Sequence, residues 1–286
     1  MMGIDHKIKS VENDSANLKT SDLCSVLIPS YDGFSDLWDP FFTLFWRYWD
    51  DCPFQVFLGT NKMNYNHPRV KIIHSGHGKN WTNRVKEQIE AIDTPYVLMM
   101  LEDFFIRQPV DTTLVLKSFE SLLSLSGEMI RLTPRPRPDV RVEGHPLIGR
   151  IKPNAPYRTS TQVAIWRRQT LLDLMKENET IWEFEDYGSR RSDIYVNGFY
   201  CTWKQVIPYG FHVVERGEWF RHEARRFKAM DIGCDFSRRP IMNRRNMLKC
   251  WYSKHSGLLR DRLIPWKIRK KIKKILQVFG FFKTLV

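Results

Sequence analysis

The chain has 286 residues, 42% of them hydrophobic, which is enough for one large or two small domains with a sizeable core. Its 45 Lys and Arg against 32 Asp and Glu give a net charge of +13, which points to an anionic partner: nucleic acid, a phosphorylated substrate or an acidic membrane surface. Five cysteines without a C-x-x-C pair argue against a disulfide framework or a zinc site, and no apolar run approaches the roughly 18–20 residues that span a bilayer.

The first half of the chain alternates apolar runs with amphipathic stretches. Residues 1–21 are polar and of mixed charge, and we expect a flexible tail there. Strands are predicted at 23–29, 54–58, 70–73 and 96–101, and helices at 36–49 and 80–92. Asn80 is the expected N-cap of the second helix, whose apolar face begins with Trp81 and Val85. This order predicts a parallel or mixed sheet sandwiched by helices.

The second half is less regular. Helices are predicted at 112–125 and 170–176, and strands at 129–132, 161–166, 198–206 and 211–214. The run Pro134–Pro138, with the sequence PRPRP, fits neither a helix nor an inner strand and predicts an exposed basic loop. We expect one domain over residues 22–255, followed by a basic tail at 256–286.

The tail has the pattern of an amphipathic helix. From Pro265 onward, apolar residues fall at helical spacing with Lys and Arg between them: Ile268, Ile272, Ile275, Leu276 and Phe279. A basic amphipathic helix is typical of a segment that lies on an anionic membrane surface. The alternative is a C-terminal helix docked on the domain, with its lysine face in solvent.

Two carboxylates, Glu102 and Asp103, follow the apolar run Tyr96–Leu101. Six apolar residues in succession predict a strand buried on both faces, and open α/β sheets bind ligands at the carboxyl ends of their strands. Another apolar run, Phe104–Ile106, comes next, so the acids do not belong to a solvated loop. A buried acid must be paired, metal-bound or protonated. The alternative is that one acid caps the next turn or pairs with an arginine.

Several common functional motifs are absent. The segment His74–Lys79 resembles a phosphate loop but lacks the first glycine and the Ser/Thr of G-x-x-x-x-G-K-[ST]. There is no G-x-G-x-x-G or G-x-S-x-G, and His74 and His77 have no third ligand at metal spacing. No zinc-finger, RNP1 or helix-turn-helix pattern explains the basic charge. These absences remove the commonest nucleotide-binding, hydrolase and DNA-binding classes.

Four patches remain, and their order along the chain is informative. They are Ile28–Asp32, Lys79–Trp81, Leu101–Asp103, and Trp182–Asp186 followed by Glu215–His222. With these patches in this order, residues 23–225 resemble the GT-A glycosyltransferases, particularly bacterial enzymes of surface-polysaccharide (capsule or lipopolysaccharide) assembly. The resemblance implies an α/β, Rossmann-type fold with a mixed, mainly parallel sheet flanked by helices. It also implies a donor-binding half at about 22–133 and an acceptor half at about 134–255.

The resemblance implies a role for each matching residue. The donor nucleotide is expected at Pro29, Ser30, Tyr31, Asp32, Asn80, Trp81, Arg84, Glu102 and Asp103. A divalent metal, Mn²⁺ or Mg²⁺, would bind Asp103 and His222 and neutralise the leaving diphosphate. Glu185 or Asp186 would be the catalytic base of an inverting transfer, its pKa raised by apolar neighbours.

Two alternatives to these roles stay open. Leu101-Glu102-Asp103 is not Asp-x-Asp, so arginines in place of a metal could hold the diphosphate: Arg84, Arg190, Arg191, Arg216 and Arg221. The acids Glu183, Glu185 and Asp186 could instead pair with Arg190 and Arg191 along a helix.

The sequence therefore predicts a transferase that moves a sugar from a nucleotide-sugar donor to a glycan or lipid-linked acceptor. The basic tail would hold it at the cytoplasmic face of the cell membrane as a peripheral protein. One alternative is a nucleotidyltransferase that makes nucleotide sugars, although no glycine-rich phosphate signature lies near the first strand. The other is a non-catalytic binder of nucleic acid or acidic polymer, but the charge is concentrated in the tail and the Pro-Arg loop, without a stacking motif. No nucleic-acid partner is expected.

Overall fold

The computed structural model describes residues 19–210, 212–248 and 250. The predicted amphipathic helix and most of the predicted N-terminal tail lie outside these residues. The described chain divides into two compact units. The first comprises residues 19–213 and 230–235, and the second comprises residues 214–229 and 236–250.

A nine-stranded sheet forms the centre of the first unit. Its strands are β1 (Cys24–Pro29), β2 (Gln55–Thr60), β3 (Val70–His74), β4 (Tyr96–Met99), β5 (Met129–Arg131), β6 (Val140–Arg141), β7 (Ile148–Arg150), β8 (Ala164–Arg167) and β9 (Phe199–Thr202). The order across the sheet is β3-β2-β1-β4-β8-β5-β9-β7-β6. Strands β7 and β8 run antiparallel to the others, so the sheet is mixed and mainly parallel, as predicted.

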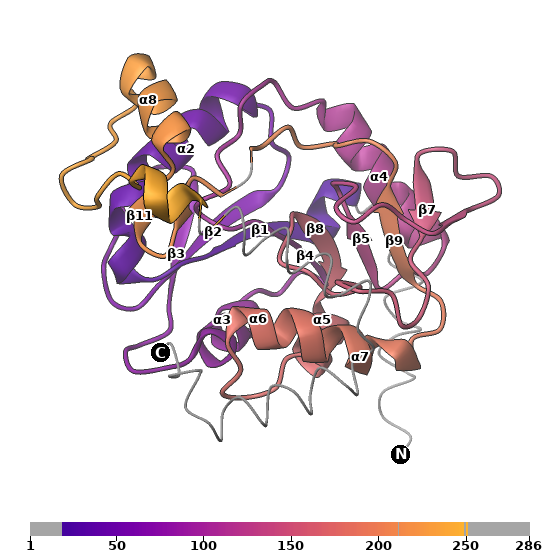
Figure 1. Ribbon diagram of the computed structural model, residues 1–286. Coiled ribbons are helices and arrows are strands. Elements are labelled where there is room, and N and C mark those ends of the chain that lie inside the picture. Colours follow the sequence, from indigo (N-terminus) through magenta and orange to yellow (C-terminus); the bar gives the residue numbers. More distant parts are fainter. Residues whose placement is uncertain (1–18, 211, 249, 251–286) are drawn as a thin grey trace. The chain divides into compact units, whose positions relative to one another are not determined.

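Helices cover both faces of this sheet (Figure 1). On one face lie α2 (Trp38–Tyr48) and α4 (Thr112–Ser124). On the other lie α3 (Trp81–Glu90), α5 (Arg168–Leu174), α6 (Ile181–Glu183) and α7 (Ser189–Arg191). The arrangement confirms the predicted α/β sandwich of Rossmann type.

The two helical layers explain the continuous apolar run of β4. Successive side chains of a strand point to opposite faces, so both faces of this strand must be apolar if both are covered. The Tyr96 ring packs against Phe119 of α4, with centroids 5.1 Å apart. Val97 instead belongs to the core cluster that contains Val85 and Ile89 of α3. Fully burying a side chain of this kind contributes about 1.5–3 kcal/mol.

The parallel strands bring their carboxyl ends to one edge of the sheet, which we call the carboxyl edge. The loops after β1, β2, β3, β4 and β5 start there. The loop before β8 reaches the same edge, because β8 is antiparallel to β4 and its first residue, Ala164, pairs with Met99. Sequence segments far apart in the chain therefore meet at this edge.

Two local predictions differ from the structure. Asn80 precedes α3 as expected, but its side chain makes no capping hydrogen bond; its Nδ2 donates instead to Asn178 Oδ1 (3.3 Å). The strand predicted at 211–214 is not formed over the described residues His212 and Val213, and β10 begins only at Val214. The other predicted strands and helices are present within a few residues of their expected bounds.

The second unit contains a short hairpin and a helix. Strands β10 (Val214–Glu215) and β11 (Glu218–Trp219) are joined by Arg216 and Gly217, which have positive φ angles of 51° and 78°. A two-residue turn with positive φ at both positions suits a tight hairpin. Trp219 is fully buried, and α8 (Arg221–Met230) follows. Within the described residues, no helix has the length and apolar character needed to cross a lipid bilayer.

Candidate active site

Asp32 ties together three loops of the carboxyl edge. Its Oδ1 accepts hydrogen bonds from the backbone N–H groups of Asn61 (2.8 Å) and Met63 (3.3 Å), and Lys62 N–H lies within reach of both carboxylate oxygens (3.2 and 3.3 Å). Asn61 Nδ2 in turn donates to the carbonyl oxygen of Gly76 (2.6 Å). The loops after β1, β2 and β3 are thus held as one surface. Asp32, predicted to contact the nucleotide, supports this surface through its carboxylate.

Gln88, on α3, supports the same loops from the core. Its buried Nε2 donates to Ser75 Oγ (3.1 Å) and to the carbonyl oxygen of Ser30 (3.4 Å). Ser30 Oγ accepts from Trp38 Nε1 (2.9 Å), so this predicted donor contact is buried. Gly59 permits the close approach of Gln88, because a Cβ at position 59 would overlap the Gln88 amide. The last residue of β1, Pro29, is also buried.

Arg84 faces Tyr31 and Glu102 at the carboxyl edge. Its guanidinium carbon lies 5.0 Å from the centroid of the Tyr31 ring, and its Nη1 donates to the carbonyl oxygen of Lys79 (2.7 Å). Burial lowers the pKa of Arg84, and the charges of Tyr31 and Glu102 act in the opposite direction. Its Nε is buried and has no hydrogen-bond partner among the described residues. We call this arrangement of an aromatic ring, a cation and a carboxylate the Tyr31–Arg84–Glu102 cluster.

The two carboxylates after β4 lie in a stretch of mostly buried residues. Glu102 is 7% exposed and Asp103 is half-buried. The carbonyl oxygen of Asp103 accepts from Val213 N–H (3.0 Å), and the following Phe104 ring stacks on Tyr209 with centroids 4.9 Å apart. This confirms that the two acids do not lie in a solvated loop.

The residues at this edge fit a divalent cation only in part. Among the side chains that the structure describes, no three His, Cys, Asp or Glu residues form a metal-binding group. Mg²⁺, however, is commonly bound by one or two carboxylates together with substrate phosphates and water. Glu102 and Asp103 could supply the carboxylates for a cation that is also bound by substrate phosphates and water. His222 belongs to the second unit, where its Nε2 is 2.9 Å from Glu223 Oε1.

Glu185 lies on the π-helical turn η3 (Phe184–Gly188). Its Oε1 accepts hydrogen bonds from Thr161 N–H (2.8 Å) and Thr161 Oγ1 (2.9 Å), and Thr161 belongs to the loop before β8. Burial raises the pKa of Glu185, against the Thr161 hydrogen bonds and the charge of Arg131. Its Oε2 accepts no hydrogen bond from the described residues. Single π-helical turns within α-helices are frequent at functional sites.

The neighbouring acids have other partners. Glu183 forms a capping box with Thr180. Asp186 pairs with Arg190 one turn later (3.0 Å), which is the helical pairing considered as an alternative for this segment. Arg191 pairs instead with Glu179 (2.6 Å). Of the three acids, Glu185 is the one directed toward the loop before β8.

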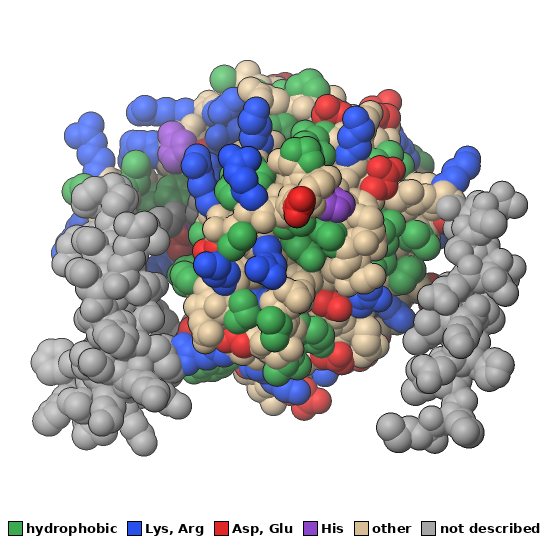
Figure 2. Space-filling view, turned by 90° about the vertical axis from the view of Figure 1, so that its right-hand side faces the viewer, with side chains coloured by type: hydrophobic (Ala, Val, Ile, Leu, Met, Phe, Trp, Pro, Cys, Tyr) green, Lys and Arg blue, Asp and Glu red, His purple; other side chains and the backbone are tan. Residues whose placement is uncertain are grey.

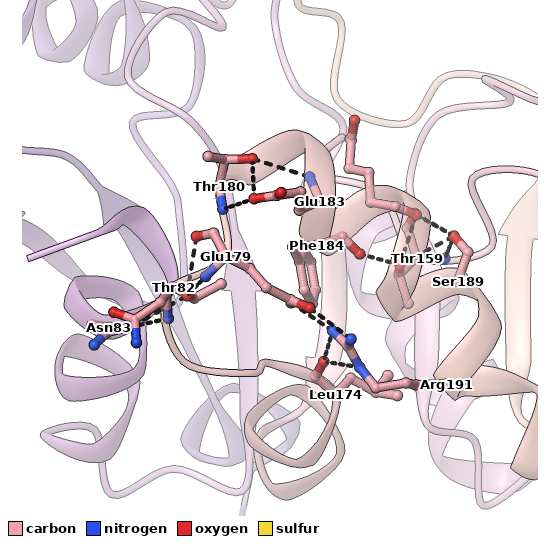
Figure 3. A network of polar contacts seen from close by, with 12 residues as sticks. Thr82, Asn83, Thr159, Leu174, Glu179, Thr180, Glu183, Phe184, Ser189 and Arg191 are labelled. Carbon is pink, nitrogen blue, oxygen red and sulfur yellow. Dashed lines mark hydrogen bonds and ion pairs between the residues drawn. The ribbon is translucent and has the colours of Figure 1, made fainter. Parts of the chain in front are cut away.

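The segment that carries Glu185 packs directly on the start of α3 (Figure 3). The rings of Trp81 and Phe184 lie 5.5 Å apart, so Trp81 contacts the residue next to Glu185. Thr82 Oγ1 donates to the carbonyl oxygen of Glu179 (3.1 Å) and accepts from its N–H (3.0 Å), as Figure 3 shows. Arg84, one helical turn after Trp81, therefore lies on an element that contacts η3.

Arg131, which no sequence pattern singled out, connects the Pro134–Pro138 run with the loop before β8. Its fully buried guanidinium donates to the carbonyl oxygens of Tyr157 (2.8 Å) and Pro136 (2.9 Å) and lies 3.4 Å from Ser160 Oγ. A charged residue inside a predicted buried strand, next to a proline-rich loop, was the available signal. For Thr161 and Gln88, no feature of the sequence indicated the contacts that they make.

Some solved structures align with this chain at low sequence identity. No family model matches the sequence, and no curated protein matches it. The 1–349 fragment of the GT-A glycosyltransferase TarS from S. aureus, in complex with UDP-GlcNAc, aligns with a TM-score of 0.44 and 14% identity over 68% of this chain and 60% of that fragment.

Two cytidylyltransferases that act on 2-C-methyl-D-erythritol 4-phosphate also align. The enzyme from Thermus thermophilus has a TM-score of 0.43 and 15% identity, over 72% of this chain and 97% of its own. The enzyme from Francisella tularensis has a TM-score of 0.34 and 15% identity, over 53% and 76%. All three alignments have TM-scores below 0.5 and identities of 14–15%.

Proposed function

We propose that this protein is a glycosyltransferase that moves a sugar from a nucleotide-sugar donor to a glycan or lipid-linked acceptor in bacterial surface-polysaccharide synthesis. One observation carries the proposal: the Tyr31–Arg84–Glu102 cluster and Glu185 occur on elements that pack on each other at the carboxyl edge of a mainly parallel sheet. Ligands of open α/β sheets bind outside this edge.

The cluster has the groups that a nucleotide diphosphate needs. Tyr31 offers a ring for stacking against the base or ribose, and Arg84 offers a planar cation that binds phosphate oxygens in pairs. The charge of Glu102 favours the charged form of the guanidinium, and the carbonyl oxygen of Lys79 accepts a hydrogen bond from its Nη1 (2.7 Å). A divalent cation at Glu102 and Asp103 would add positive charge at the leaving diphosphate when bound.

Glu185 would act as the catalytic base of an inverting transfer. Thr161 holds one of its carboxylate oxygens, which leaves Oε2 for the hydroxyl group of the acceptor. A general base works best when its pKa is near the operating pH, and burial shifts the pKa of Glu185 upward, toward that range. Asp186, which pairs with Arg190, is the weaker candidate for this role.

The basic tail would keep the enzyme near its acceptor. Residues 256–286 lie outside the described residues, and their proposed role at the cytoplasmic membrane face rests on the amphipathic pattern alone. A variant ending at residue 255 should lose co-sedimentation with anionic vesicles and keep nucleotide binding. Equal sedimentation of both forms would contradict the membrane role.

Nucleotide binding tests the donor site. Thermal unfolding is followed with UDP, GDP, CMP and dTDP, each with and without Mn²⁺, because a ligand that binds the folded state raises the melting temperature. We expect one nucleotide to stabilise the protein and Arg84→Gln to remove most of that shift. Arg47→Gln, which removes an exposed charge from α2, is the matched control. No shift from any nucleotide, or an equal shift in Arg84→Gln, would contradict the assignment.

A further inference from the structure

The Pro-Arg loop, residues 134–138, presents two arginines on a stiff backbone. Three prolines fix the φ angles of alternate residues. Arg135 N–H donates to the carbonyl oxygen of Thr133 (2.9 Å), and Pro138 is buried against Gly149, where a Cβ would lie 2.8 Å from the Pro138 Cβ. Arg135 and Arg137 are exposed. The loop therefore displays two cations, two residues apart, on a backbone with little conformational freedom left to lose on binding.

Arg131 anchors this loop beside the candidate base. Its buried guanidinium donates to the carbonyl oxygen of Pro136 (2.9 Å) in the loop and lies 3.4 Å from Ser160 Oγ. Ser160 is adjacent to Thr161, which donates to Glu185. The Pro-Arg loop is thus connected to Glu185 through one buried side chain and one short segment.

The charge around the loop is positive. Arg131, Arg135 and Arg137 lie within seven residues, and the nearest acid in sequence, Asp139, accepts a hydrogen bond from Lys152 N–H (2.8 Å). Basic side chains are also spread over the face seen in Figure 2, with acidic ones between them. Exposure of an arginine is therefore not by itself a sign of a binding site. This pair differs because Arg131 joins its loop to the segment that holds the candidate base. Arginine pairs of this kind suit phosphate, whose oxygens accept bidentate hydrogen bonds.

We propose that Arg135 and Arg137 bind a phosphate group carried by the acceptor, close to the hydroxyl group that Glu185 deprotonates. This inference rests on the proposed function and specifies the acceptor as phosphate-bearing. The phosphate could belong to a soluble glycan or to a lipid, and the chemistry at the loop is the same for both.

Binding of glycerol 3-phosphate tests the subsite. The titration is carried out with the donor site saturated by the nucleotide that the thermal panel identifies, so that the probe reports on the loop. We expect the wild type to bind and Arg135→Gln/Arg137→Gln to bind at least tenfold more weakly. The control, Arg47→Gln/Lys117→Gln, removes two likewise exposed charges from α2 and α4 and should bind like the wild type. The single variant Arg137→Gln gives an intermediate affinity and guards against a folding defect in the double variant.

Vesicles distinguish the two sources of phosphate. Phosphatidylcholine vesicles with and without phosphatidic acid are sedimented with both proteins, which keep the same basic tail. Weaker binding of the loop variant to phosphatidic acid vesicles supports a lipid phosphate, whereas a loss confined to glycerol 3-phosphate supports a glycan phosphate. Unchanged binding of both probes by the loop variant, or no binding of either by the wild type, overturns the inference. Nucleotide binding by the wild type is scored separately, so a failure of the proposed function is recognised independently.

Discussion

Replacing Glu185 by glutamine separates its chemical role from its structural one. Glutamine has the same shape, and its Oε1 can still accept the two Thr161 hydrogen bonds of 2.8 and 2.9 Å. What is lost is the ability to take a proton. General-base catalysis contributes about 10²–10⁴-fold, so we expect turnover to fall by that factor, which corresponds to a barrier higher by about 2.7–5.4 kcal/mol.

The same substitution has a stability consequence of known sign. Burial raises the pKa of Glu185 in the folded protein above its unfolded value. The stability that this group contributes is fully present below the unfolded pKa and is lost as the pH rises through the folded pKa. Above the folded pKa the buried, ionised carboxylate is then a cost that glutamine removes. We therefore expect Glu185→Gln to melt at the same or a higher temperature than the wild type.

The assay measures release of nucleoside diphosphate from the sugar donor that the nucleotide panel selects. Asp186→Asn is the control, because it breaks an exposed ion pair with Arg190, and exposed ion pairs contribute little free energy. We expect its turnover to stay within about twofold of the wild type. In the wild type, kcat/KM should fall as the pH drops through the raised pKa. A Glu185→Gln enzyme with more than a tenth of wild-type turnover, or a large loss in Asp186→Asn alone, would refute the assignment of the base.

Two further substitutions test how the site is supported. Gly59→Ala forces a Cβ into the Gln88 amide, and overpacking of this kind costs about 1–3 kcal/mol. We expect the melting temperature to fall by roughly 2–12 °C. An unchanged melting temperature would contradict the close approach of Gly59 and Gln88. Glu179→Gln weakens the ion pair with Arg191 at the junction of α3 and η3, and we expect a loss of about 1–3 kcal/mol in denaturant unfolding with nucleotide affinity unchanged. A loss of nucleotide binding without a loss of stability would mean that Glu179 contacts the donor.

The part of the fold that the sequence predicts well is the part whose signals are local. The run that forms β4 is apolar because helices cover both of its faces, and its position was clear from the sequence, although the strand ends at Met99, two residues before the predicted end. The same apolar run indicated that Glu102 and Asp103 lie at the end of this strand. In the second half, β6 and β7 have only two and three residues, too few for a periodic pattern.

The sequence singled out the segments of the candidate site, but how their side chains lie depends on contacts between distant residues. Asn80 was expected to cap its own helix, but its partner is Asn178, 98 residues later. The sequence could not separate Glu185 from Asp186, because the difference lies in Thr161, 24 residues earlier. Arg131 was passed over since its three acceptors are two backbone carbonyls and a serine, which no motif encodes.

The most direct test of the central claim identifies what leaves the donor. Purified protein is incubated with a panel of nucleotide sugars and the release of nucleoside diphosphate is measured, while a parallel incubation with added pyrophosphate measures the formation of nucleoside triphosphate. The proposed function predicts release of nucleoside diphosphate from one donor, lost in Arg84→Gln and Glu185→Gln. Formation of nucleoside triphosphate from a nucleotide sugar and the added pyrophosphate, without release of nucleoside diphosphate, would contradict it in favour of a nucleotidyltransferase, and no reaction with any donor would leave the carboxyl edge without the catalytic role proposed for it.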